Sequence, residues 1–182
     1  MRLSRTLMAT AASALVAVAS LTASTGPADA APSWAPVATA AIHPGTMMYT
    51  DGAQCTANFV YTDAAGNVYV GYAAHCAGKG AATDTNGCNV DSVPLGTKVT
   101  FTNDGNLASE GTPVGHGTLA YSSWITEKQI GTSDPNTCAY NDLALVRVDA
   151  ADISKVNPSV PFWGGPTGID TDGTKAGDRV WT

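Results

Sequence analysis

Two short runs of strand-forming residues, 57–62 and 67–73, flank the turn sequence DAAG. Val, Tyr, Phe and Thr residues bounded by a glycine-containing turn are typical of a β-hairpin. A hairpin centred between Ala65 and Gly66 places Cys55 opposite Cys76. Since cross-strand neighbours are close enough for a disulfide, the sequence predicts a cross-linked pair of antiparallel strands.

The chain has four cysteines, and an even number is typical of an exported protein with disulfides. Pairing Cys55 with Cys76 leaves Cys88 for Cys138, which closes a longer loop. No C-x-x-C motif occurs, and the histidines lack the spacing of zinc ligands. The sequence therefore predicts two disulfides, no structural metal site and no bound cofactor.

Residues 1–30 have the pattern of a secretory signal peptide. Arg2 and Arg5 precede an apolar, Ala-rich segment, and Ala28-Asp29-Ala30 fits a cleavage site. The apolar segment is too short for a membrane span. The sequence therefore predicts a secreted, extracellular protein.

The formal net charge of the chain is −6 at pH 7, and its few basic residues are scattered. Nucleic acids and anionic membranes attract clustered Lys and Arg, so we expect neither as a partner. No later segment approaches the length of an apolar membrane span. The chain that remains after cleavage suits one domain with its own core.

From residue 49 onward the pattern is that of short strands separated by Gly, Asn and Asp clusters, without a sustained helical period. Residues 31–48 are rich in Ala and Pro and are predicted to form an N-terminal arm or a short propeptide. Many short strands indicate an all-β fold, either an antiparallel barrel or a sandwich. The expected strands are 57–62, 67–73, 97–102, 118–125 and 143–148, with weaker candidates near 159–163 and 178–181.

His75 is the first candidate functional residue. It ends the stretch GYAAHC, next to Cys76 and behind two alanines that let a neighbouring segment approach closely. The predicted disulfide fixes the backbone there and holds a titratable imidazole on a rigid element. A histidine beside a structural cysteine can also be a bystander.

Asp142 is the second candidate, at the entrance of the apolar strand in YNDLALVRV. A carboxylate beside a buried strand is costly unless hydrogen-bond donors surround it. A histidine is a suitable donor, because a carboxylate that accepts its Nδ1–H leaves Nε2 free as a base. The alternative is that Asp142 only caps the strand through its own backbone.

These two stretches resemble the trypsin-like (chymotrypsin-fold) serine peptidases, particularly secreted bacterial members. The family's histidine motif is matched by Ala74-His75-Cys76, with its partner cysteine one hairpin upstream at Cys55. The family's aspartate motif, Asp-Leu-Ala-Leu, begins here at Asp142 and follows the histidine, as in the family. The resemblance covers roughly residues 50–150.

The resemblance implies two antiparallel Greek-key barrels with an active site between them. Residues 49–155 would form the first barrel, and residues 156–182 would begin a second barrel that is mostly missing. His75 would be the general base and Asp142 would orient it. The implied reaction is hydrolysis of polypeptide substrates through an acyl-enzyme, by a protein that is monomeric at full length.

The family's nucleophile, a serine between glycines, does not appear after Asp142. Ser154 and Ser159 are the only serines there, neither has flanking glycines, and Trp163 occupies the serine's place in FWGGP. We expect a truncated chain that lacks the nucleophile and is inactive alone. The alternative is a secreted, non-catalytic β-domain or an inactive relative with a binding role.

Overall fold

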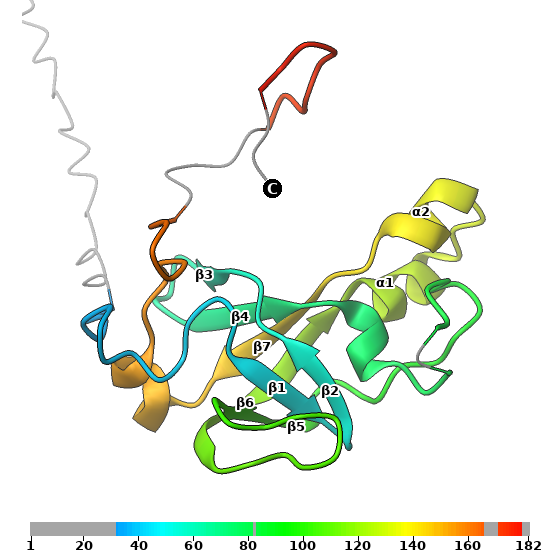
Figure 1. Ribbon diagram of the computed structural model, residues 1–182. Coiled ribbons are helices and arrows are strands. Elements are labelled where there is room, and N and C mark those ends of the chain that lie inside the picture. Colours follow the sequence, from blue (N-terminus) through cyan, green and yellow to red (C-terminus); the bar gives the residue numbers. More distant parts are fainter. Residues whose placement is uncertain (1–31, 82, 166–170, 180–182) are drawn as a thin grey trace, which may run out of the picture.

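The computed structural model describes residues 32–81, 83–165 and 171–179, so the predicted signal peptide lies outside the described residues. One seven-stranded sheet dominates the structure, in the order β2-β1-β5-β6-β7-β4-β3 with every neighbouring pair antiparallel (Figure 1). The strands are β1 (Met47–Thr50), β2 (Ala53–Thr56), β3 (Val60–Thr62), β4 (Val68–Tyr72), β5 (Lys98–Thr102), β6 (Pro113–Ser122) and β7 (Ala144–Val148). The helices are α1 (Ser123–Ile130) and α2 (Pro135–Tyr140), with 3-10 turns η1 (Ala74–Ala77) and η2 (Ala150–Lys155).

The core forms on one face of the strands, because successive side chains of a strand point to opposite faces. Strand β4 buries Val68, Val70 and Tyr72, and β7 buries alternate residues from Ala144 to Val148. Gly117 on β6 lets the chain approach β7 closely, since a Cβ there would lie 2.6 Å from the Arg147 carbonyl oxygen. The largest fully buried side chains are Trp124, Tyr72, Phe101, Ile42, Met48, Leu119 and Glu127.

The all-β class holds in its coarse form, and the sheet is not closed into a barrel by strand pairing. Its two edge strands, β2 and β3, are each paired on one side only within the described residues. They follow one another in sequence, separated by residues 57–59. Among all the residues that the structure describes, no helix has the length and apolar character needed to cross a bilayer.

The predicted hairpin forms, but its register differs from the prediction by one residue. Val60 faces Val70, which centres the turn on Ala65 rather than after it. Gly66 has a φ of 77°, and the Asp63 carboxylate accepts the Ala65 N–H. A three-residue loop with a left-handed glycine is a common hairpin connection, and its odd length shifts the register.

Both predicted disulfides are present. Cys55 and Cys76 are joined with a Cα–Cα distance of 5.9 Å, and Cys88 and Cys138 with 5.2 Å. The hairpin prediction places the first pair on facing strands, and this placement is wrong. Cys55 lies on β2 opposite Met48 of β1, and Cys76 lies in η1 after β4.

All five principal strand predictions overlap strands of the sheet, but β1 begins inside the segment assigned to the N-terminal arm. The weaker candidate at 159–163 is wrong, since Val160 forms only an isolated bridge with Gly164. Phe162 has a φ of 69°, which is incompatible with an extended chain there. Residues 178 and 179 are in no strand, and residues 180 and 181 lie outside the described residues.

Two short α-helices accompany the sheet, and the strand pattern of the sequence does not predict them. The predicted strand 118–125 ends at Ser122 and continues directly into α1. Helix α2 follows an N-cap, Asp134, whose side chain accepts the Thr137 N–H, with Pro135 in its first turn. An N-cap aspartate followed by proline favours the start of a helix.

Removing the disulfides tests how far they stabilise the fold. Replacing Cys88 and Cys138 by alanine is expected to lower the free energy of unfolding by about 4 kcal/mol, since the cysteines are 50 residues apart. The Cys55 and Cys76 double variant is expected to lose about 3 kcal/mol, because the separation is 21 residues. Urea denaturation measures both losses. A loss below about 1 kcal/mol for either pair contradicts the chain-entropy explanation.

Candidate functional site

Adjacent strands bring His75 and Asp142 together from positions 67 residues apart. His75 lies in η1, directly after β4, and Asp142 lies between α2 and β7. Strands β4 and β7 are paired with Tyr72 opposite Ala144, so the end of one strand meets the start of the other. The His75 Nδ1 to Asp142 Oδ2 distance is 2.7 Å. The structure therefore joins the two candidate residues by a direct hydrogen bond.

A second hydrogen bond connects the same two residues. The backbone N–H of His75 donates to Asp142 Oδ1 at 2.8 Å. Each carboxylate oxygen thus accepts one bond from the same residue, one from its backbone and one from its ring. The imidazole cannot turn away from the carboxylate without breaking a bond, so its orientation is fixed.

The pair is partly exposed, with side-chain exposures of 33% for His75 and 25% for Asp142. An ionised carboxylate only accepts hydrogen bonds, so Nδ1 of the imidazole carries the proton in this pairing. The other ring nitrogen, Nε2, then has its lone pair free in the neutral ring. The arrangement can accept a proton at Nε2 and stabilise the resulting cation through Asp142.

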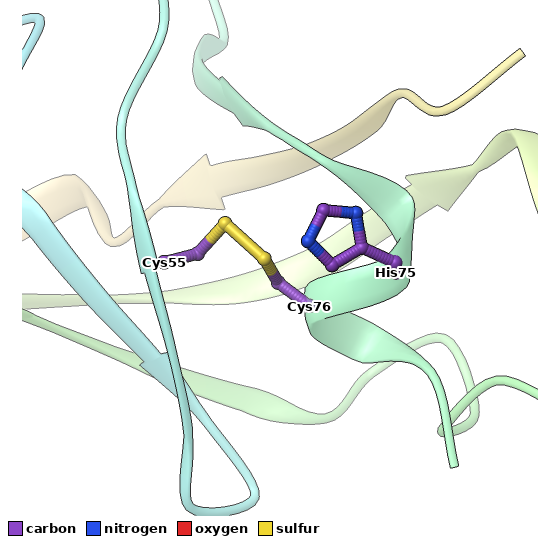
Figure 2. Close-up of side chains that lie close together, drawn as sticks. All are labelled: Cys55, His75 and Cys76. Carbon is purple, nitrogen blue, oxygen red and sulfur yellow. A yellow bond between two sulfur atoms is a disulfide. The ribbon is translucent and has the colours of Figure 1, made fainter. Parts of the chain in front are cut away.

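The backbone that carries His75 is held on both sides. The Cys76 N–H donates to the Ala73 carbonyl, and the Gly78 N–H donates to the His75 carbonyl, which closes the short turn η1. The disulfide from Cys76 to Cys55 adds a covalent link to β2. Figure 2 shows the imidazole beside this disulfide.

The same three residues, Cys55, His75 and Cys76, have potential ligand atoms within 4.8 Å of one another. Zinc and similar ions are bound by thiolate sulfur. Both sulfur atoms here are bonded to each other, so they do not provide thiolates. The donor set does not suit a metal ion.

Neither Ser154 nor Ser159 is hydrogen-bonded to His75 in the part of the chain that the structure describes. Ser154 lies in η2, and among the described residues no serine hydroxyl donates a hydrogen bond to the His75 ring. Ser159 lies beside a surface hollow of about 220 Å³ that Phe59 and Val60 also line. The exposed Trp163 side chain likewise carries no group that could act as the nucleophile.

No protein-family model, curated protein or solved structure matches this chain. The resemblance to trypsin-like peptidases therefore stays a prediction from the motifs around His75 and Asp142. Function resides in a site rather than in a fold, so the hydrogen bonds of these two residues carry the argument.

Glu127 is a buried carboxyl near this site that the sequence pattern does not single out. It lies on α1 with 1% exposure, and its Oε1 atom has no hydrogen-bond partner among the described residues. Burial raises its pKa, a hydrogen bond from the Asn141 side chain opposes the shift, and the charge of Asp142 adds to it. The net shift is upward, so Glu127 binds a proton more tightly in the fold than in the unfolded chain.

The raised pKa of Glu127 predicts how stability depends on pH. Its stabilising contribution is complete below the unfolded value near 4.5 and is lost as the pH rises through the higher folded value. Glu127→Gln removes this loss, because the amide does not titrate. The difference in unfolding free energy should shift in favour of the variant as the pH rises above the unfolded value near 4.5. Urea denaturation at several pH values measures it, and a difference that is flat or moves toward the wild type contradicts the assignment.

Proposed function

We propose that this chain is part of a secreted serine endopeptidase of the trypsin-like type. In this proposal His75 is the general base and Asp142 orients it. The observation that carries the proposal is the 2.7 Å contact between His75 Nδ1 and Asp142 Oδ2, together with the 2.8 Å bond from the His75 backbone. A bystander histidine or a strand-capping aspartate does not require either bond.

The chemistry follows from the tautomer that the carboxylate selects. Nε2 of His75 accepts the proton of a serine hydroxyl as the oxygen attacks the carbonyl carbon of a peptide bond. The imidazolium is stabilised by Asp142 and then donates its proton to the departing amine. General base catalysis of this kind contributes about 10²–10⁴-fold to a rate.

The nucleophile belongs, in this proposal, to a segment outside residues 1–182. Ser154 and Ser159 lack the flanking glycines that let a chain turn sharply and aim N–H groups at an oxyanion. The donors for the oxyanion come from the same outside segment. The described residues by themselves therefore hold a base without its nucleophile and are expected to be inactive alone.

The proposed architecture is the first Greek-key barrel of a two-barrel fold. The short connection between the two edge strands, β2 and β3, supports this architecture. Ala57 donates to the Thr46 carbonyl beside β1, and the next residue, Asn58, donates to the Gly71 carbonyl of β4. One extended segment therefore passes from one edge of the sheet to the other, which is how strands that change partners close a barrel.

The compartment and the substrates complete the proposal. Two disulfides suit an oxidising environment, and the first 30 residues have the pattern of an export signal. The substrates are polypeptides outside the cell. A peptide carbonyl is the electrophile on which a base and a serine hydroxyl act together.

The test begins with the reading frame beyond Thr182. It should continue into a serine between glycines, and the protein expressed from the whole frame should hydrolyse peptides and be labelled by a fluorophosphonate probe. His75→Ala should abolish most turnover, and Asp142→Asn should lower kcat by about 10⁴-fold, because the amide selects the wrong tautomer. Rates of peptide hydrolysis measure both effects.

His116→Ala is the matched control, because His116 lies on β6 opposite Thr100 and its backbone is hydrogen-bonded to Asp149 and Asp152, not to His75 or Asp142. Its activity should equal that of the wild type. A stop codon directly after Thr182, with no labelling of the purified chain, contradicts the proposal and favours a non-catalytic binding domain. A near-normal kcat in Asp142→Asn removes Asp142 from the mechanism.

A further inference from the structure

Ser123, the first residue of α1, contacts the chain on both sides of Asp142. Its hydroxyl donates to the Asn141 carbonyl at 2.6 Å and accepts the Leu143 N–H at 3.1 Å. Its backbone N–H donates to the Leu143 carbonyl at 2.8 Å. Ser123 is fully buried, with 0% exposure. Three hydrogen bonds of one buried residue therefore hold the backbone on both sides of Asp142.

We propose that Ser123 is the positioning residue for Asp142, an inference that rests on the proposed function. The Asn141 carbonyl belongs to the peptide plane that precedes the Asp142 Cα, and the Leu143 N–H belongs to the plane that follows it. Planar peptide groups leave only φ and ψ free at that Cα. Holding both planes fixes these two angles and hence the direction of the Asp142 Cβ.

The hydroxyl suits this role because it is both a donor and an acceptor. A partly buried backbone group that loses its hydrogen-bond partner destabilises the conformation that held it. An alanine at position 123 leaves the Asn141 carbonyl and the Leu143 N–H without the Ser123 hydroxyl. The loop is then expected to relax toward other partners and to carry the Asp142 carboxylate with it.

Helix α1 also contacts the element that carries His75. Trp124 follows Ser123 in α1, and Gly78 caps η1. A Cβ at Gly78 would lie 2.9 Å from the Trp124 ring, so Trp124 packs against the end of η1. One turn later, the Asn141 side chain and the charge of Asp142 both influence the pKa of the buried Glu127 carboxyl. The start of α1 therefore sets the Asp142 loop and η1 relative to each other, with Ser123 making the bonds nearest to the carboxylate.

Ser122 provides a matched control. It precedes Ser123, is 1% exposed, and its hydroxyl has no hydrogen-bond partner among the described residues. Ser122→Ala therefore removes an equally buried hydroxyl without breaking a hydrogen bond. Ser123→Thr and Ser123→Val form a second matched pair, because their side chains have the same shape and differ in the hydroxyl.

The readout is the low-field proton resonance of His75 Nδ1–H, recorded on the chain as it stands. Ser122→Ala and Ser123→Thr should retain the wild-type resonance. Ser123→Ala and Ser123→Val should shift it upfield or lose it, because the proton no longer faces a fixed carboxylate. An unchanged resonance in the folded Ser123→Ala or Ser123→Val variant overturns the proposal.

Hydrogen exchange on the wild-type chain decides the question even if the variants do not fold. The Leu143 amide should exchange far more slowly than an unprotected amide, because the buried Ser123 hydroxyl accepts its proton. Exchange at the unprotected rate overturns the proposal.

A kinetic measurement separates this inference from the proposed function. In the protein expressed from the whole reading frame, Ser123→Ala should lower kcat by about 10²-fold with little change in KM, as expected for a misplaced catalytic group. A loss confined to KM contradicts a positioning role. If the whole protein cleaves no peptide, the proposed function fails, while the resonance and the exchange rate still decide whether Ser123 positions Asp142.

Discussion

The two hydrogen bonds that the Asp142 carboxylate accepts from His75 are the contact on which the remaining structure depends. A partly buried carboxylate needs donors, and one residue supplies both, through its backbone and its ring. The pairing of β4 with β7 places these residues within reach although 67 positions separate them. The fold therefore presents a histidine with a fixed ring and a defined tautomer, which is the part of a catalytic base that a protein scaffold must supply.

Short local motifs were enough to predict this contact. His75 follows a strand and adjoins a cysteine, Asp142 precedes an apolar strand, and neither feature depends on distant residues. Both disulfide pairs were predicted correctly, although Cys55 and Cys76 do not face each other across the hairpin on which that prediction rested. The strands themselves were predictable at their centres, where apolar residues alternate. The signals for His75, for Asp142 and for the strand centres each lie within a short stretch of sequence.

The failures concern properties that depend on the whole chain. The hairpin register is wrong by one residue, because the Asp63 carboxylate and Gly66 together stabilise a three-residue loop. Helix α1 lacks an apolar stripe, since its buried residues include Ser123 and Glu127, and both face polar groups that arrive from a distant loop. Their importance was invisible without that loop. Closure of the sheet into a barrel also depends on contacts between distant segments, and it belongs to the proposed architecture.

The measurement that tests the central claim most directly is the tautomeric state of His75, read from long-range proton–nitrogen correlations of the neutral imidazole in the folded chain. The account predicts a protonated Nδ1 and an unprotonated Nε2, because the Asp142 carboxylate accepts the ring proton. A neutral ring with its proton on Nε2 would contradict it, since such a ring could neither donate to Asp142 nor accept a proton from a serine hydroxyl at Nε2.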